Sequence, residues 1–364
     1  MNATLPPPAR VLVVGIGGLG GTFAGWLNQL AETGLAEVVG LTRNAAVVEA
    51  VEREGYRLRG VGEHLDVRGA IASALPDDLE RFDYAILATQ PPQVEAAAER
   101  ALPWLKDDGA MVVIQNGLCE ERIGRIAGPE RVLGCIVGFG ASHPEPGVFE
   151  RTSAGGLTVG RLDGGADPRV DRLAALLEAV APVTVTDNLA GARWSKLAIN
   201  SAISTLGTLG ADRLGPLMHV RVVRRLALEI MTETVRVARA QGVVLEKVSG
   251  TLDLEWLALT DEEQARGGSA SLVAKHTLLL AVGTRYRRLR SSMLYAIEQG
   301  REPAVDFLNG EVVARGEQLG IDTPVNRRAQ ELVHAIARGE LEGGVPLIRR
   351  FAGEFGFRWG PHAD

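Results

Sequence analysis

One lysine and one asparagine, four residues apart, are the side chains of this sequence best suited to protonate a reacting oxygen. Lys196 and Asn200 would lie on one face of a helix, and Ser204 extends the same row by one more turn. A lysine partly buried beside another positive charge would have a lowered pKa and could give a proton to an alkoxide forming on a substrate. The alternative is a surface lysine that extends its charged end into solvent. Lysine is scarce in this chain, whose lysines are Lys106, Lys196, Lys247 and Lys275.

A glycine-rich turn could hold the phosphates of a dinucleotide. Residues 15–20 match the pattern GxGxxG between a strand expected at 11–15 and a helix expected at 22–33. The glycines would let the backbone close tightly and approach a pyrophosphate, and the helix N-terminus would supply N–H donors. The alternative is an ordinary strand-to-helix turn. The cofactor-binding residues expected in this turn are Gly15, Ile16, Gly17, Gly18, Leu19 and Gly20.

The residue after the next expected strand, at 37–42, would choose between the two nicotinamide dinucleotides. An acidic side chain there accepts a hydrogen bond from the ribose of NAD, whereas a basic one pairs with the 2′-phosphate of NADP. Arg43 stands at this position, and no Asp or Glu ends the strand. The sequence therefore predicts NADP, with NADPH as the reductant. Arg43 could also be a solvated surface residue.

The elements that must position these residues divide the chain in two. Apolar runs alternate with helical segments up to residue 187, which indicates a Rossmann-type, doubly wound parallel sheet over 1–189 that binds NADP. Long segments with a 3.6-residue period follow, which indicates an all-helical substrate domain over 190–364. Strands are expected at 11–15, 37–42, 84–88, 111–115, 132–137, 156–160 and 183–186, and helices at 22–33, 93–105, 169–181, 192–206, 216–241, 269–284, 306–319 and 326–338.

Composition narrows the class of protein and partner. The 364 residues, 46% of them hydrophobic, are enough for two compact domains. A net charge of −6 provides no positive field for a nucleic acid or an anionic membrane, so we expect a small-molecule partner. Cys119 and Cys135 form neither a disulfide framework nor a zinc motif, so we expect a reducing, cytoplasmic setting and no metal site. Residues 1–10 lack the features of a signal peptide, and no run of about 18 apolar residues occurs.

Several motifs together give the sequence a resemblance to the ketopantoate reductases (2-dehydropantoate 2-reductases). Each motif alone is unspecific, but their order and spacing cover most of the chain. The motifs are Gly15–Gly20, Gln115-Asn116-Gly117, Trp194-Ser195-Lys196-Leu197-Ala198-Ile199-Asn200, Arg290-Ser291-Ser292-Met293-Leu294 with Asp306-Phe307-Leu308-Asn309-Gly310, and the closing Gly320-Ile321-Asp322-Thr323-Pro324-Val325-Asn326.

The resemblance implies an NADPH-dependent oxidoreductase that acts on a CH–OH group and reduces a 2-oxo acid in pantothenate biosynthesis. It makes Lys196 the general acid and Asn200 its neighbour at the substrate. It places Asn116 at the boundary between cofactor and substrate, and Ser292 as a donor to the substrate carboxylate. It also implies a homodimer joined through the helical domain. Asn116 could instead be a turn residue, and Ser292 a helix N-cap.

Four positions depart from the usual residues of this family. Gln90 replaces a lysine after the fourth strand, and it stays among the expected cofactor-binding residues. Ser204 replaces a second asparagine on the catalytic helix, and it stays among the expected substrate-binding residues. Leu289 replaces another asparagine, and Ala304 replaces a glutamate. Because a pocket with fewer hydrogen-bonding partners selects differently, we predict a 2-oxo acid other than ketopantoate, with a less polar tail.

Two other functions remain open from the sequence. One is a reductase of an imine or of a bulkier, less polar ketone in the same cleft, and the other is a non-catalytic NADP-binding sensor. Retention of Lys196 with Asn200 argues against the sensor. His276 could replace the lysine as the acid. A basic row could steer an anionic substrate or form a solvated surface, and it comprises Arg285, Arg287, Arg288 and Arg290.

Overall fold

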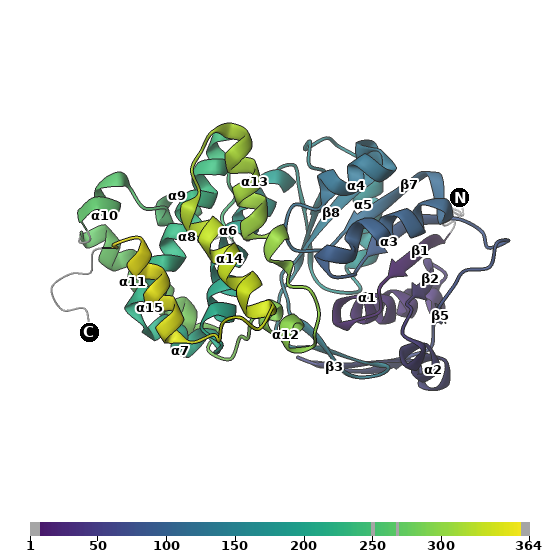
Figure 1. Ribbon diagram of the computed structural model, residues 1–364. Coiled ribbons are helices and arrows are strands. Elements are labelled where there is room, and N and C mark those ends of the chain that lie inside the picture. The colour runs from purple at the N-terminus through teal and green to yellow at the C-terminus, as the bar shows by residue number, and fades with distance from the viewer. Residues whose placement is uncertain (1–7, 249–251, 267–268, 358–364) are drawn as a thin grey trace. The chain divides into compact units, whose positions relative to one another are not determined.

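The computed structural model describes residues 8–248, 252–266 and 269–357. Its contacts divide the chain into two units (Figure 1). The first comprises Met1–Gln115 and Cys119–Ala190, and the second comprises Asn116–Leu118 and Gly191–Asp364. The first unit is mixed α/β and the second is all-helical, which confirms the predicted fold class. The short loop Asn116–Leu118 belongs to the helical unit although it directly follows the first unit in the sequence.

An eight-stranded sheet lies at the centre of the first unit, in the order β12-β11-β8-β7-β6-β1-β2-β5. The strands from β8 to β5 are parallel, whereas β11 runs antiparallel to β8. All seven strands expected for this sheet are present, and β5 is an additional edge strand. Their bounds are β1 (Ala9–Val14), β2 (Ala36–Leu41), β5 (Ala70–Ala72), β6 (Phe82–Leu87), β7 (Leu105–Val113), β8 (Val132–Val137), β11 (Leu157–Gly160) and β12 (Val183–Thr186).

Helices cover both faces of this sheet, which explains why its strands are continuous apolar runs. Val11, Leu12, Val13 and Val14 of β1 are all buried, although alternate residues point to opposite faces. Val11 and Val13 share a core with residues of α1 and α5. The helices of this unit are α1 (Gly18–Gln29), α2 (Ala45–Glu54), α3 (Val94–Ala101), α4 (Glu120–Ala127) and α5 (Pro168–Leu177), with short 3₁₀ turns η1 (Leu30–Thr33), η2 (Pro91–Gln93), η3 (Leu102–Trp104) and η4 (Pro129–Arg131).

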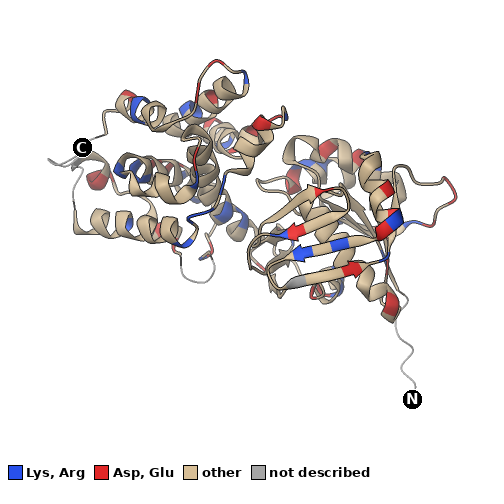
Figure 2. Cartoon of the chain, turned by 90° about the horizontal axis from the view of Figure 1, so that it is seen from below, with Lys and Arg blue, Asp and Glu red and all other residues tan. Residues whose placement is uncertain are grey.

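A second, four-stranded sheet in this unit was not predicted. It has the order β4-β3-β10-β9, and both basic and acidic residues occur along its strands (Figure 2). α1 packs closely against this sheet through two glycines. A Cβ on Gly21 would lie 2.0 Å from the Phe149 ring, and one on Gly25 would lie 2.7 Å from the side chain of Leu58. The strands are β3 (Tyr56–Gly60), β4 (Glu63–Val67), β9 (Ala141–Glu145) and β10 (Val148–Arg151).

The second unit is a bundle around one apolar core, to which Leu118 contributes beside Leu197 and Leu226. The helix expected at 216–241 is two helices, because the backbone is extended at Val220. α9, α10, α12 and α15 were not predicted. No helix among the described residues combines the length and hydropathy that a membrane crossing needs. The bounds are α6 (Leu189–Leu209), α7 (Leu214–His219), α8 (Arg221–Ala240), α9 (Leu254–Leu257), α10 (Asp261–Arg266), α11 (Ala270–Arg285), α12 (Ser292–Glu298), η5 (Ala304–Phe307), α13 (Asn309–Leu319), α14 (Pro324–Ala337) and α15 (Val345–Glu354).

Candidate active site

The glycines of the 15–20 turn meet different steric limits. Gly15 has a φ of +96°, in the left-handed region that favours glycine, and its N–H donates to Leu41 O at 2.8 Å. A Cβ on Gly20 would lie 1.9 Å from Gly15 O, so α1 can follow β1 this closely only with glycine there. A Cβ on Gly17 would meet nothing within 4 Å. The backbone at Gly17 is therefore open to an approaching group, as pyrophosphate binding requires.

The N-terminus of α1 presents backbone donors beside this open glycine. Gly17 is the N-cap residue, makes no side-chain capping bond, and is followed by no acidic residue in the first turn. Uncapped N–H groups and the helix dipole favour an anion at this end. Ile16 is buried in the core next to the turn, whereas Leu19 is half-buried. The turn thus fits the diphosphate of a nicotinamide dinucleotide, which would lie against Gly17 and the first turn of α1.

Arg43 and Gln90 follow the two strands that flank β1, at the same edge of the sheet as the turn. Val14 of β1 pairs with Leu41 on one side and with Leu87 on the other. Arg43 is exposed and makes no hydrogen bond or ion pair with another described residue, and Gln90 is exposed at the start of η2. From β1 the chain continues to β2 and β5 on one side, and then crosses to β6 on the other side of β1. The sheet therefore has its topological switch point between β1 and β6, and ligands of doubly wound sheets bind at the carboxyl ends of the strands at such a point.

Gln115 has a structural part in this edge that the sequence did not reveal. Its side chain is buried, and Nε2 donates to Leu87 O at 2.8 Å and to Thr89 O at 3.1 Å. These bonds fix the loop that leads from β6 to Gln90. The first residue of the Gln115-Asn116-Gly117 motif therefore orders the cofactor edge of the sheet.

α6 carries the predicted chemical row of the second unit. Lys196, Asn200 and Ser204 are each half-buried on this helix, while Ser195 and Leu197 beside the lysine are buried. Ser195 Oγ donates to the backbone oxygen of Glu246 at 2.7 Å, and this contact holds the first part of α6. The row thus lies where the helix passes from core to surface, with its first half anchored.

Ser291, rather than Ser292, caps α12, and it also ties α12 to α6. Ser291 Oγ accepts from Leu294 N at 3.2 Å, donates to Ser204 O at 2.8 Å and lies 2.9 Å from Thr208 Oγ1. The N-cap alternative for Ser292 is therefore wrong. Ser292 is the exposed first residue of α12, beside the part of α6 that carries Ser204.

The Asn116 loop packs against the segment that precedes α13. Gly117 has a φ of +95°, and a Cβ there would lie 2.5 Å from Phe307 O. Asn116 is exposed, whereas Leu118 is buried in the core of the helical unit. Glycine at 117 therefore lets the loop lie against η5 with Asn116 at the surface.

Two of the departures from the family pattern are also located. The Leu289 side chain is exposed, whereas its backbone oxygen accepts from Leu214 N at 2.9 Å and its N–H donates to Tyr286 O at 2.8 Å. Ala304 is half-buried at the start of η5. The backbone at Leu289 is thus fixed independently of its side chain, so the substitution changes local polarity without changing the loop.

His276 is poorly suited to replace the lysine as an acid. Burial, together with Arg224 and Arg221, lowers its pKa to about 4. Its Nδ1 is buried and has no hydrogen-bond partner among the residues that the structure describes. A neutral imidazole near pH 7 has no proton to give as a cation.

The predicted basic row lies at the end of α11 and in the segment that follows it. Arg290 pairs with Glu298, and Arg285, Arg287 and Arg288 are exposed.

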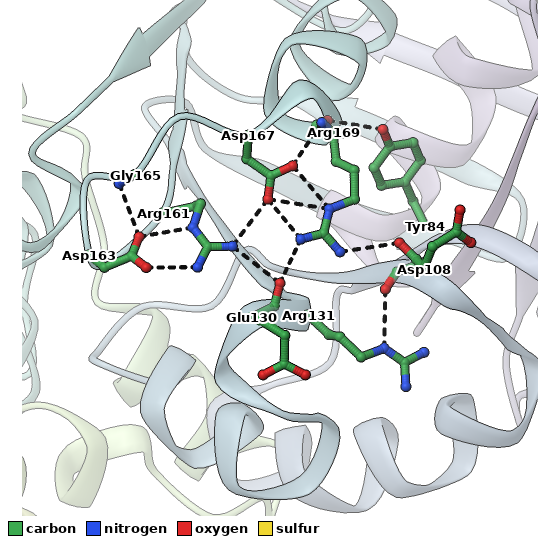
Figure 3. Close-up of polar contacts among 10 residues, drawn as sticks. Tyr84, Asp108, Glu130, Arg131, Arg161, Asp163, Gly165, Asp167 and Arg169 are labelled. Carbon is green, nitrogen blue, oxygen red and sulfur yellow. Dashed lines mark hydrogen bonds and ion pairs between the residues drawn. The ribbon is translucent and has the colours of Figure 1, made fainter.

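A second polar cluster, in the first unit, has its charges paired with one another (Figure 3). Asp167 caps α5 and pairs with Arg169 at 2.7 Å and with Arg161 at 3.1 Å, while Arg161 also pairs with Asp163 at 2.7 Å. The arginines lower the pKa of each aspartate to about 2. Both guanidinium groups donate to Glu130 O as well. This cluster joins loops of the sheet and is a structural anchor.

No group of three metal-binding side chains occurs in the described part of the chain.

Comparison with known proteins gives the same family for both units. The family model described as "Ketopantoate reductase PanE/ApbA" matches residues 11–164, and the one described as "Ketopantoate reductase PanE/ApbA C terminal" matches residues 188–337. The 2-dehydropantoate 2-reductase of Halobacterium salinarum is 30% identical over 334 residues, covering 90% of this chain and 99% of that protein. The corresponding enzyme of Pyrococcus horikoshii is 24% identical over 92% of this chain and 99% of its own.

Solved structures agree on the fold. A PanE/ApbA family ketopantoate reductase from Ralstonia eutropha superposes with a TM-score of 0.74 at 25% identity, covering 91% of this chain and 99% of its own. A D-mandelate dehydrogenase, solved with NADH and anilino(oxo)acetate, superposes with a TM-score of 0.75 at 20% identity over the same shares. This chain belongs to the ketopantoate reductase PanE/ApbA family of NAD(P)-dependent oxidoreductases.

Proposed function

We propose that this protein is an NADPH-dependent reductase of a 2-oxo acid and that Lys196 is its general acid. The observation that carries the proposal is the α6 row of Lys196 and Asn200, with Ser292 placed beside the same helix by the bonds of Ser291. An ammonium group and an amide on one helix, with a hydroxyl on the helix beside it, suit a substrate that carries a carbonyl and a carboxylate.

The residues divide the work of reduction between them. The nicotinamide, when bound, supplies the hydride to the carbonyl carbon. Lys196 donates a proton to the carbonyl oxygen as negative charge develops there, and Asn200 donates a hydrogen bond to the same oxygen. Ser292 donates to the substrate carboxylate. Asn116 orients the reacting groups at the boundary between cofactor and substrate.

The preference for NADP rests on Arg43. This guanidinium is exposed beyond β2, has no partner among the described residues, and can pair with a 2′-phosphate. A D-mandelate dehydrogenase of the same fold was solved with NADH, so we assign the choice of dinucleotide to this side chain and not to the fold. Gln90 in place of a lysine leaves Arg43 as the cation we assign to this end of the cofactor site.

The substrate we propose has a less polar tail than ketopantoate. Leu289, Ala304 and Ser204 stand where the resemblance expects asparagine, glutamate and asparagine, so fewer groups can bind a substrate hydroxyl. A D-mandelate dehydrogenase shares the fold, and its structure contains an anilino(oxo)acetate. Aryl-substituted and branched aliphatic 2-oxo acids are therefore the first compounds to test.

We also propose a homodimer formed through the helical unit, which sedimentation equilibrium would test.

The test is turnover of a panel of 2-oxo acids, measured as loss of NADPH absorbance. An apolar 2-oxo acid is expected to react with a kcat/KM of at least about 10⁴ M⁻¹s⁻¹, and ketopantoate below this value. Turnover of an imine but of no 2-oxo acid would contradict the assigned substrate class. Ketopantoate as the best substrate would contradict the assigned tail.

A further inference from the structure

A buried chain of hydrogen bonds ends on α6 next to the proposed chemical row. It starts at Glu233 of α8, a residue that is 4% exposed. Its carboxylate accepts from the backbone N–H groups of Val325 at 2.9 Å and Asn326 at 2.8 Å, and from Asn326 Nδ2 at 2.8 Å. Glu233 therefore caps the start of α14 from another helix and orients the Asn326 amide.

The chain continues through two asparagine side chains to α6. Asn309 Nδ2 donates to Asn326 Oδ1 at 2.9 Å and to Ser201 O at 3.1 Å. Thr205 Oγ1 donates to Asn309 Oδ1 at 2.5 Å. All four of these residues are fully buried. Both hydrogens and the oxygen of the Asn309 amide are used, so its orientation is determined.

These bonds attach to α6 beside Asn200 and Ser204, in the second half of the chemical row. Ser201 follows Asn200, and Thr205 follows Ser204, so the attachment lies about 100° around the helix axis from the row. An apolar contact tolerates small rotation or sliding of a helix, whereas a buried directional hydrogen bond does not. The attachment therefore fixes which way the row points.

The same segment also positions the Asn116 loop. Asn309 begins α13 one residue after the end of η5, and Phe307 O of η5 lies against Gly117. One short stretch of chain thus touches both α6 and the loop that carries Asn116. This gives a physical role to two sequence motifs whose asparagines, Asn309 and Asn326, had none.

We propose that Glu233 is a positioning residue for the reductase reaction, acting through Asn326 and Asn309 on the rotation and axial position of α6. The inference rests on the proposed function, because its effect on turnover passes through Lys196. Glu233 touches neither substrate nor cofactor in this account. It sets the geometry of a helix that does.

The sharpest test removes one hydroxyl without changing the shape of the core. Thr205→Val leaves Asn309 Oδ1 without its donor, and Thr205→Ser restores the hydroxyl. The matched control is Thr234→Val on α8, since Thr234 is equally buried and, among the described residues, its hydroxyl bonds to Ile230 O of its own helix, an oxygen that keeps Asn326 Nδ2 as a donor at 3.1 Å in the variant. We expect Thr205→Val to lower kcat about tenfold with an unchanged KM for NADPH, Thr205→Ser to recover most of it, and Thr234→Val to stay within about twofold.

Hydrogen–deuterium exchange of α6 gives a readout that does not need turnover. Thr205→Val and Glu233→Gln are each expected to raise exchange in peptides from α6 about tenfold, while peptides from the first unit and from α15 stay unchanged. Glu233→Gln acts because an amide N–H would face the donors of Val325 and Asn326. Thr234→Val is expected to leave α6 exchange as in the parent protein.

The two proposals fail in different ways. If Lys196→Ala retains full activity, the proposed function fails, and α6 exchange still decides the positioning role. If Lys196→Ala is inactive while Thr205→Val matches Thr234→Val in both kcat and α6 exchange, the positioning role of the Glu233 chain is wrong. A loss of kcat in Thr205→Val that Thr205→Ser does not restore would also contradict it.

Discussion

The glycine turn of the first unit and the α6 row of the second are built in different ways. The turn works through its backbone, with Gly15 in a left-handed conformation, Gly20 packed against Gly15 O, and Gly17 open. The α6 row works through side chains whose surroundings come from distant parts of the chain. Ser291 lies 87 residues from Ser204, and Asn309 lies 104 residues from Thr205. The proposed cofactor turn therefore depends on local sequence, whereas the orientation of the proposed catalytic side chains depends on tertiary contacts.

Gly20→Ala is expected to have the largest effect, because it breaks the local side of this contrast. Its Cβ would lie 1.9 Å from Gly15 O, so α1 must move away from β1. We expect the free energy of unfolding of the first unit to fall by about 4 kcal/mol in urea denaturation followed by fluorescence. Gly17→Ala is the control, since open space surrounds that position. It is expected to unfold as the parent does, but to bind NADPH about tenfold more weakly. Equal unfolding of the two variants would refute the distinction between them.

Asn200→Ala tests the tertiary side of the contrast. Loss of one donor to the developing oxyanion is expected to lower kcat about 100-fold, with the dissociation constant of NADPH unchanged. Single-turnover kinetics and cofactor fluorescence would measure the two quantities. A raised KM for the 2-oxo acid at constant kcat would instead show that Asn200 binds substrate and transition state equally.

Arg43→Ala tests whether the proposed cofactor site depends on a side chain as well as on the backbone of the glycine turn. Removal of a charge-assisted partner of the 2′-phosphate is expected to weaken NADPH binding about tenfold and to leave NADH binding unchanged. Isothermal titration with both dinucleotides would check this. If both affinities fall equally, or if the parent protein prefers NADH, Arg43 does not read the 2′-phosphate.

The fold could be predicted where burial produced an unbroken apolar run, as in β1, and it was missed where the signal was weaker. β3 alternates buried Tyr56 and Leu58 with the more exposed Arg57 and Arg59, a period-2 pattern that marks a half-buried strand. This pattern is a sequence signal for β3, although the strand was not predicted. The break at Val220 carries no glycine or proline, so nothing local marks it. No spacing in the sequence indicates that Asn309 bonds to Thr205, because the contact depends on how α13 packs against α6.

His276 offers the smallest effect, a pH dependence of stability in the helical unit. Its pKa in the folded protein is about 4, below the ordinary value of 6.5, mainly because of burial. The unfolded chain takes up this proton below pH 6.5, whereas the folded protein does not until about pH 4. The free energy of unfolding should therefore fall by about 1 to 2 kcal/mol as the pH drops across this window. His276→Gln should lose this component, and His64→Gln, at an exposed position of β4, should keep it. Identical pH profiles for the two variants would contradict the assignment.

The most direct test of the central claim is turnover of the best 2-oxo acid by Lys196→Ala, measured with its affinity for NADPH. Lys247→Ala is the matched control, because Lys247 is a largely exposed lysine whose amine lies 3.9 Å from Asp253. We expect Lys196→Ala to lose about 10²- to 10⁴-fold in kcat and to bind NADPH as the parent does, while Lys247→Ala is unaffected. Undiminished turnover in Lys196→Ala would contradict the claim that α6 supplies the proton.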